Sequence, residues 1–111
     1  MSERDTPSLL QDILEAIGNI KAFTQGLTLD TYKSDLKTKH AVERNFAIIG
    51  EAVARIDASY KSLHSDIDWR QVKDFRNILV HDYFGIDDAI VWEIIQMDLN
   101  MLDAQIRGLL L

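Results

Sequence analysis

The chain of 111 residues has no cysteine, and it holds only one proline and five glycines. Without cysteine, the chain can have no disulfide, no thiolate zinc site and no cysteine nucleophile. Because helix breakers are so few, long helices are favoured over an architecture of short strands and turns. No apolar run is long enough to span a bilayer, and the N-terminus shows no apolar signal region. We therefore expect a cytoplasmic protein that has no contact with a membrane.

Basic charge is also scarce, since 12 Lys and Arg stand against 18 Asp and Glu and give a net charge of −6. Proteins that bind nucleic acid usually carry a basic surface, so this balance argues against broad, non-specific binding of RNA or DNA. It leaves room for a local basic cleft. The sequence also lacks a glycine-rich phosphate loop and the Gly-x-Ser-x-Gly pattern, so nucleotide-activating chemistry is not indicated.

Apolar residues recur at helical spacing from the start of the chain. The first helix is predicted to begin at Thr6-Pro7, with Thr6 as the N-cap, and to stop near Gly26. A short helical turn is expected at residues 29–33. The next long helix should begin near Asp35 and carry one apolar stripe.

The second half of the chain predicts two more helices. Residues 58–66 are polar and are expected to form a loop, and a third helix should begin at residues 66–68. Asp87 is a candidate N-cap for the last helix, which should run over residues 88–107. Trp69, Trp92 and the methionines stand at core spacing and are expected to pack inside.

The fold class predicted from these segments is all-α. We expect a compact antiparallel bundle of four main helices plus a short helix, forming a single domain over residues 1–111. The last helix is apolar around much of its circumference, and such a helix is buried on more than one side. In a domain of this size the second side predicts a subunit interface, and therefore a homodimer.

The most chemically capable stretch is residues 76–83, with the sequence RNILVHDY. Arg76 is a permanent cation that can brace a phosphate, His81 can exchange a proton near neutral pH, and Tyr83 offers a modifiable hydroxyl. A lone histidine in this position is more often a helix-end cap than a catalyst, and Tyr83 alone could be a core or interface residue. The three histidines are too scattered for a metal triad, so we expect no metal and no cofactor.

Helical periodicity adds a constraint to this stretch. On one straight helix Arg76 lies about 40° from Val72, on the apolar side, and His81 lies about 140° from Arg76. Asp74 and Asn77 share the face of His81 and can orient its imidazole. Because Arg76 and His81 point apart, either the chain turns just before His81, or two subunits bring complementary copies together.

Three segments resemble the HEPN superfamily and, within it, the HepT-like toxins that are paired with a minimal nucleotidyltransferase antitoxin, MntA. They are WRQVKDFRNILVHDYF at residues 69–84, VWEII at 91–95 and KHAVERNFAIIGEA at 39–52. The resemblance covers nearly the whole chain in a consistent order. It implies a helical homodimer in which the Arg-x-x-x-x-His motifs of both subunits line one cleft. Asp82 stands where Gly is common in the family, and an acidic neighbour can tune His81.

The resemblance implies a metal-independent endoribonuclease, the toxin of a type VII-like toxin–antitoxin pair. Arg76 and His81 would be catalytic, with His81 moving the protons of 2′-hydroxyl attack and Arg76 stabilising charge on phosphorus. Asn77 and Asp74 would support them. The partner nucleotidyltransferase would silence the toxin by transferring AMP to Tyr83. The implied partners are an RNA substrate such as tRNA or mRNA, the MntA-like antitoxin and a second copy of the chain.

Two other functions stay open on the residues alone. The first is a catalytically inactive helical module that binds and regulates a nucleotidyltransferase, which the acidic balance and Asp82 favour. The second is a four-helix ligand-binding or scaffold dimer, which is all that the composition supports. The combination of Arg76, Asn77 and His81 favours the nuclease.

Overall fold

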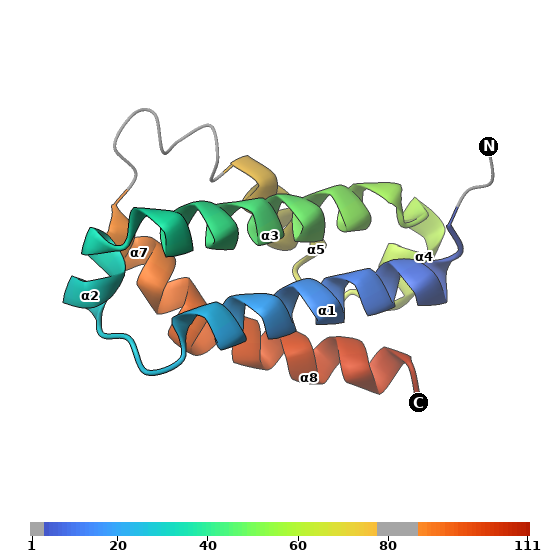
Figure 1. Cartoon of the computed structure of the whole chain (residues 1–111). Coiled ribbons are helices and arrows are strands. Elements are labelled where there is room, and N and C mark those ends of the chain that lie inside the picture. Colours follow the sequence, from blue (N-terminus) through green and yellow to red (C-terminus); the bar gives the residue numbers. More distant parts are fainter. Residues whose placement is uncertain (1–3, 78–86) are drawn as a thin grey trace.

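Two long antiparallel helices, α1 (Thr6–Thr24) and α3 (Leu36–Arg55), form the centre of the protein (Figure 1). The computed structural model describes residues 4–77 and 87–111, and within these ranges the chain is helical and has no strand. Helix α8 (Leu99–Leu109) packs against α1, and α5 (Trp69–Asp74) packs against α3. The predicted all-α bundle is confirmed. None of the described helices is both long and apolar enough to cross a membrane.

The remaining elements are short. Helix α2 is Leu29–Ser34, and α4 is Ala58–Leu63. A 3-10 turn, η1 (Phe75–Asn77), extends α5. Helix α7 (Asp88–Glu93) continues through a π-helical segment, η2 (Ile94–Asp98), directly into α8. The predicted last helix is therefore confirmed in place, but it reaches Leu109 and contains a π segment that the periodicity did not reveal.

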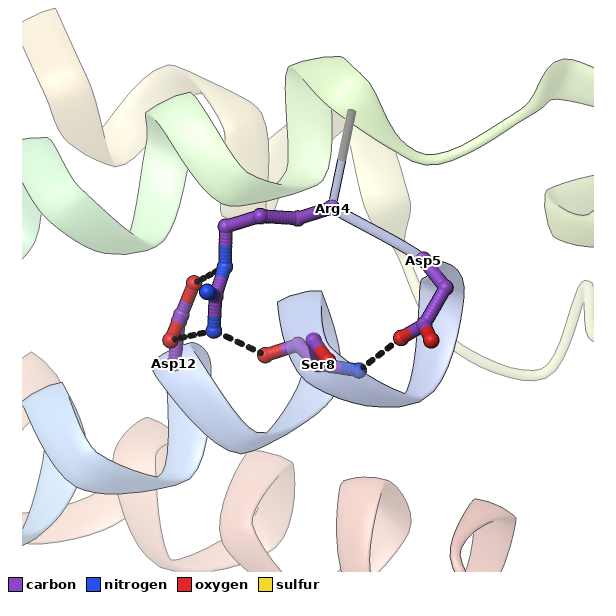
Figure 2. A network of polar contacts seen from close by, with 4 residues as sticks. All are labelled: Arg4, Asp5, Ser8 and Asp12. Carbon is purple, nitrogen blue, oxygen red and sulfur yellow. Dashed lines mark hydrogen bonds and ion pairs between the residues drawn. The ribbon is translucent and has the colours of Figure 1, made fainter. Parts of the chain in front are cut away.

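The start of α1 differs by one residue from its prediction. Asp5, not Thr6, is the N-cap, and its carboxylate accepts a hydrogen bond of 2.8 Å from the backbone amide of Ser8. Aspartate caps a helix at least as well as threonine, so the acidic side chain takes the position. Arg4 then braces the first turns, because its guanidinium donates two bonds of 2.8 Å to Asp12 (Figure 2).

The other predicted helix boundaries can be compared in the same way. Helix α1 ends just before Gly26, which has a φ of 80°, and Asp35 caps α3, so both of these predictions are confirmed. Asp87 caps α7 by accepting a bond of 2.8 Å from the amide of Ala89, also as predicted. The predicted loop at 58–66 is wrong, because α4 occupies most of it. A helix of six residues is too short to show a periodic apolar pattern.

The core lies where α1, α3, α5 and α8 meet. An edge-to-face contact between Phe46 and Phe75, with ring centroids 5.3 Å apart, joins α3 to η1. Trp92 is half-buried against Tyr32 at 5.3 Å. The prediction for the methionines is wrong for Met97 and Met101, which are 64% and 61% exposed. The fully buried side chains of the core include Leu10, Ile13, Ile17, Ile20, Val42, Phe46, Ile49, Val53, Leu99 and Ile106.

Candidate functional site

The Arg-x-x-x-x-His string begins in η1, directly after α5. Hydrogen bonds in the first turn of α5 hold that helix in place. The Asp68 carboxylate accepts a bond of 3.1 Å from the amide of Gln71, which caps the helix. The indole nitrogen of Trp69 donates a bond of 3.0 Å to the carbonyl oxygen of His64. These bonds fix the direction in which the chain runs toward Arg76.

The backbone at Arg76 lies directly against Gly50 of α3. A Cβ added at Gly50 would lie 2.6 Å from the Cβ of Arg76 and 2.7 Å from the carbonyl oxygen of Lys73. Only glycine allows so close an approach of two backbones. Sequence reasoning did not identify Gly50 as part of the site. The available signal was a glycine in the middle of a strongly helical pattern, which indicates close packing.

Arg76 itself is exposed, and it makes no ion pair or hydrogen bond with any residue that the structure describes. Its Cβ nevertheless faces α3, next to Gly50. The α-helix ends at Asp74, and η1 has three residues per turn, so each residue advances by about 120° rather than 100°. Two such steps move Arg76 about 40° further around the axis from Val72 than an α-helix would.

Asp74 and Asn77 are both exposed, and within residues 4–77 and 87–111 neither side chain makes a hydrogen bond. His81, Asp82 and Tyr83 lie outside the described residues, so the orientation of His81 by Asp74 and Asn77 stays a prediction, as does the meeting of Arg76 and His81. Within the same described ranges, no group of three or more His, Asp and Glu side chains is arranged to hold a metal ion.

One face of α3 contacts both η1, where the Arg-x-x-x-x-His string begins, and α7, which follows the string in the sequence. Lys39, Glu43, Phe46 and Gly50 follow each other at spacings of four, three and four residues, which places them on one side of the helix. At one end of this face, Lys39 forms an ion pair of 2.9 Å with Asp88 at the start of α7. At the other end, Gly50 receives η1. Glu43 between them is buried, at 5% exposure, and sequence reasoning also missed it.

The chain is similar to a known protein family and to individual proteins over nearly its whole length. The family described as "Ribonuclease HepT-like" matches residues 13–109. The chain belongs to this family. A "Probable ribonuclease HepT" of Thermococcus cleftensis is 36% identical over 107 residues, which cover 96% of this chain and 97% of that protein. A candidate RNase of Methanocaldococcus jannaschii is 32% identical over 107 residues, covering 96% and 98% of the two chains. No solved structure matches the chain.

The match to the ribonuclease HepT-like family spans every part of the site described above. It includes α3 with Gly50, the η1 turn with Arg76, and the ion pair between Lys39 and Asp88. The resemblance stated from the sequence is confirmed.

Proposed function

We propose that this chain is an endoribonuclease with Arg76 and His81 as its catalytic residues. The observation that carries the proposal is Arg76, an exposed cation without a partner among the described residues, on a turn whose backbone is fixed against Gly50. An ion-paired arginine would have to break that pair to bind a phosphate, whereas a free and positioned one is ready to do so. Membership of the ribonuclease HepT-like family supports RNA as the substrate.

The proposed reaction needs no metal. His81 takes the proton of a ribose 2′-hydroxyl, and the resulting oxygen attacks the adjacent phosphorus. The bond from phosphorus to the 5′-oxygen breaks. That oxygen receives a proton from a general acid, the His81 of the other subunit in a dimer. The products are a 2′,3′-cyclic phosphate and a 5′-hydroxyl. Arg76 stabilises the extra negative charge on the phosphoryl oxygens, and Asn77 and Asp74 position the phosphate or His81.

The proposal includes a homodimer. Ile90, Met97 and Met101 are 54%, 64% and 61% exposed, and they lie along the continuous helix from α7 to α8. Large apolar side chains exposed together usually mark an interaction surface. A second copy on this face would bury them and bring a second Arg76 and His81 to the assembly.

We further propose that the enzyme is the toxin of a type VII-like toxin–antitoxin pair. A partner nucleotidyltransferase would transfer AMP to the hydroxyl of Tyr83. The adenylate adds bulk and a phosphate charge, which would occupy Arg76 and repel RNA phosphates. Intact mass spectrometry of the chain co-expressed with such an enzyme should show adenylate-sized increments that map to Tyr83. Tyr83→Phe should keep cleaving RNA and should escape this silencing.

The nuclease is tested by incubating the purified protein with single-stranded RNA in the presence of EDTA. Wild-type protein should produce cyclic phosphate ends, and Arg76→Gln should lower the rate by about 10²- to 10³-fold. His81→Ala should lower it by about 10²- to 10⁴-fold. Arg107→Gln is the matched control, since Arg107 is an exposed arginine of α8 that pairs with Asp103.

Equal cleavage by His81→Ala and wild-type protein would overturn the mechanism. Loss of cleavage in EDTA would contradict its independence of metal. Growth arrest on expression, relieved by His81→Ala, separates the nuclease from an inactive module that only regulates a nucleotidyltransferase.

A further inference from the structure

The negative charge of the chain is unevenly distributed. Residues 36–55 and 69–77, which form α3, α5 and η1, hold seven Lys and Arg but only three Asp and Glu, a net charge of +4. The rest of the chain holds five Lys and Arg against 15 Asp and Glu, a net charge of −10. The elements that hold and receive Arg76 are therefore net basic, although they include the exposed carboxylates of Glu51 and Asp74.

Within this region, α3 presents a row of basic side chains to solvent. Lys37, His40 and Arg44 are all exposed, and spacings of three and four residues place them on one face of the helix. We call these three residues the α3 basic row. From residue 36 to residue 50 the only carboxylate is that of Glu43, which is buried. Lys37 and Arg44 make no ion pair or hydrogen bond with any described residue.

The α3 basic row borders the contact that holds Arg76. Counted at 100° per residue from Gly50, the three residues lie about 80° to 140° around the axis of α3, next to the face that receives η1. The other flank of α3 packs on α1, where Asn19 donates a bond of 3.2 Å to Asn45. Along the axis, Arg44 lies about 9 Å and Lys37 about 20 Å from Gly50. The row therefore leads away from Arg76 along the open side of α3.

We propose that the α3 basic row binds the backbone phosphates of the RNA strand that flanks the scissile bond. The inference rests on the proposed function. Exposed lysine and arginine side chains bind phosphates by charge and release counterions, so such binding weakens as salt increases. The row contains no Phe, Tyr or Trp on which a base can stack, and contacts of lysine and arginine with phosphates carry no sequence information. It therefore holds the strand without reading its sequence, and it extends the substrate to a single strand several nucleotides long.

The binding test uses protein that carries His81→Ala, so that the RNA stays intact, and a single-stranded RNA of about 16 nucleotides, the upper range of comparable binding sites. Lys37→Gln/Arg44→Gln should weaken binding about tenfold. It should also lower the slope of log K against log salt by about 0.7 for each lost phosphate contact. Lys21→Gln/Lys33→Gln is the control, because it removes the same charge from α1 and α2. Its affinity should stay within about twofold of the parent.

Cleavage by protein with His81 intact separates this inference from the proposed function. Lys37→Gln/Arg44→Gln should lower kcat/KM on the long RNA, while its rate on a dinucleotide should equal that of wild-type protein, because a dinucleotide does not reach the row. Suppose that wild-type protein cleaves the long RNA, and that the row variant binds and cleaves it as well as the control does. The proposed role of the row is then wrong, whereas the proposed ribonuclease activity is unaffected. Wild-type protein that cleaves neither RNA overturns both. If polyglutamate displaces the bound RNA as well as unlabelled RNA of equal charge does, the row binds an acidic polypeptide instead.

Discussion

Arg76 and Gly50 approach each other so closely that a Cβ at position 50 would lie 2.8 Å from the backbone nitrogen of Arg76. The contact joins α3 to η1, which are separated in the chain by α4 and α5. The placement of the proposed catalytic arginine is therefore set by a residue of α3 that has no side chain. Whatever moves the η1 turn away from α3 moves the guanidinium as well.

Gly50→Ala should destabilise the protein and reduce RNA cleavage together. Alanine is the better helix former by about 1 kcal/mol, but its methyl group would overlap backbone atoms of Lys73 and Arg76. Overpacking of this kind costs typically about 1–3 kcal/mol, so the clash should win. Urea denaturation measures the loss. Gly18→Ala in α1 is the control, since nothing lies within 4 Å of its added Cβ, and it should be neutral or stabilising. A Gly50→Ala protein as stable as wild type would refute the contact.

Some features of this fold are visible in the sequence, and others depend on how distant elements pack. The apolar stripes of α1 and α3 depend on a period of 3.6 residues, so they are visible in the sequence and correctly predict the buried faces. The change from α to 3-10 winding at Phe75, where η1 packs against α3, is not signalled by any local pattern in the sequence. The close contact between Gly50 and Arg76 depends on how α3 packs against η1, so the sequence does not show it.

The ion pair between Lys39 and Asp88 should couple α3 to α7. Its nitrogen–oxygen distance is 2.9 Å, and the two side chains are only 16% and 19% exposed. A double-mutant cycle with Lys39→Gln and Asp88→Asn should give a coupling free energy of about 1 kcal/mol, the upper end for pairs near a surface. The pair of Asp103 and Arg107 in α8 is the comparison. Its arginine is 66% exposed, so this pair should couple less and respond more to salt. Equal coupling of the two pairs would contradict the shielding of the first.

Asp35 should make the stability of α3 sensitive to acid. The amide and hydroxyl of Thr38 donate bonds of 3.0 and 2.7 Å to its carboxylate, and these bonds lower the pKa of Asp35 below its ordinary value of 3.8. Because the folded pKa is the lower one, the contribution is complete above about pH 3.8 and is lost as the pH falls through the folded pKa.

The measurement is the thermal unfolding midpoint as a function of pH. Asp35→Ala should unfold at a lower temperature than wild type near neutral pH, and the two midpoints should converge in strong acid. Asp35→Asn is the control, since asparagine also caps a helix but carries no titrating carboxyl. If the unfolding midpoints of wild type and Asp35→Ala differ by the same amount in strong acid as at neutral pH, the charge of Asp35 does not contribute to stability.

The exposed apolar side chains of α8 and the π segment should decide the oligomeric state. Met97→Glu/Met101→Glu places two charges on the proposed interface, where burying them unpaired is costly. Sedimentation should show a dimer for wild type and a monomer for this variant, with cleavage lost in parallel. Leu63→Glu is the control, because Leu63 on α4 is 80% exposed and lies outside that interface.

Mixing wild-type protein with inactive Arg76→Gln/His81→Ala protein tests whether the dimer shares one cleft. Once subunits have exchanged, each mixed dimer holds one intact Arg76 and one intact His81, both on the wild-type subunit. If the cleft needs His81 from both subunits, the mixed dimer lacks either the general base or the general acid, and an excess of the inactive protein should abolish cleavage. If each subunit is complete by itself, the mixture should cleave RNA in proportion to the wild-type subunits that it contains. The rate of the mixture therefore distinguishes a turn within one chain from a site built by two.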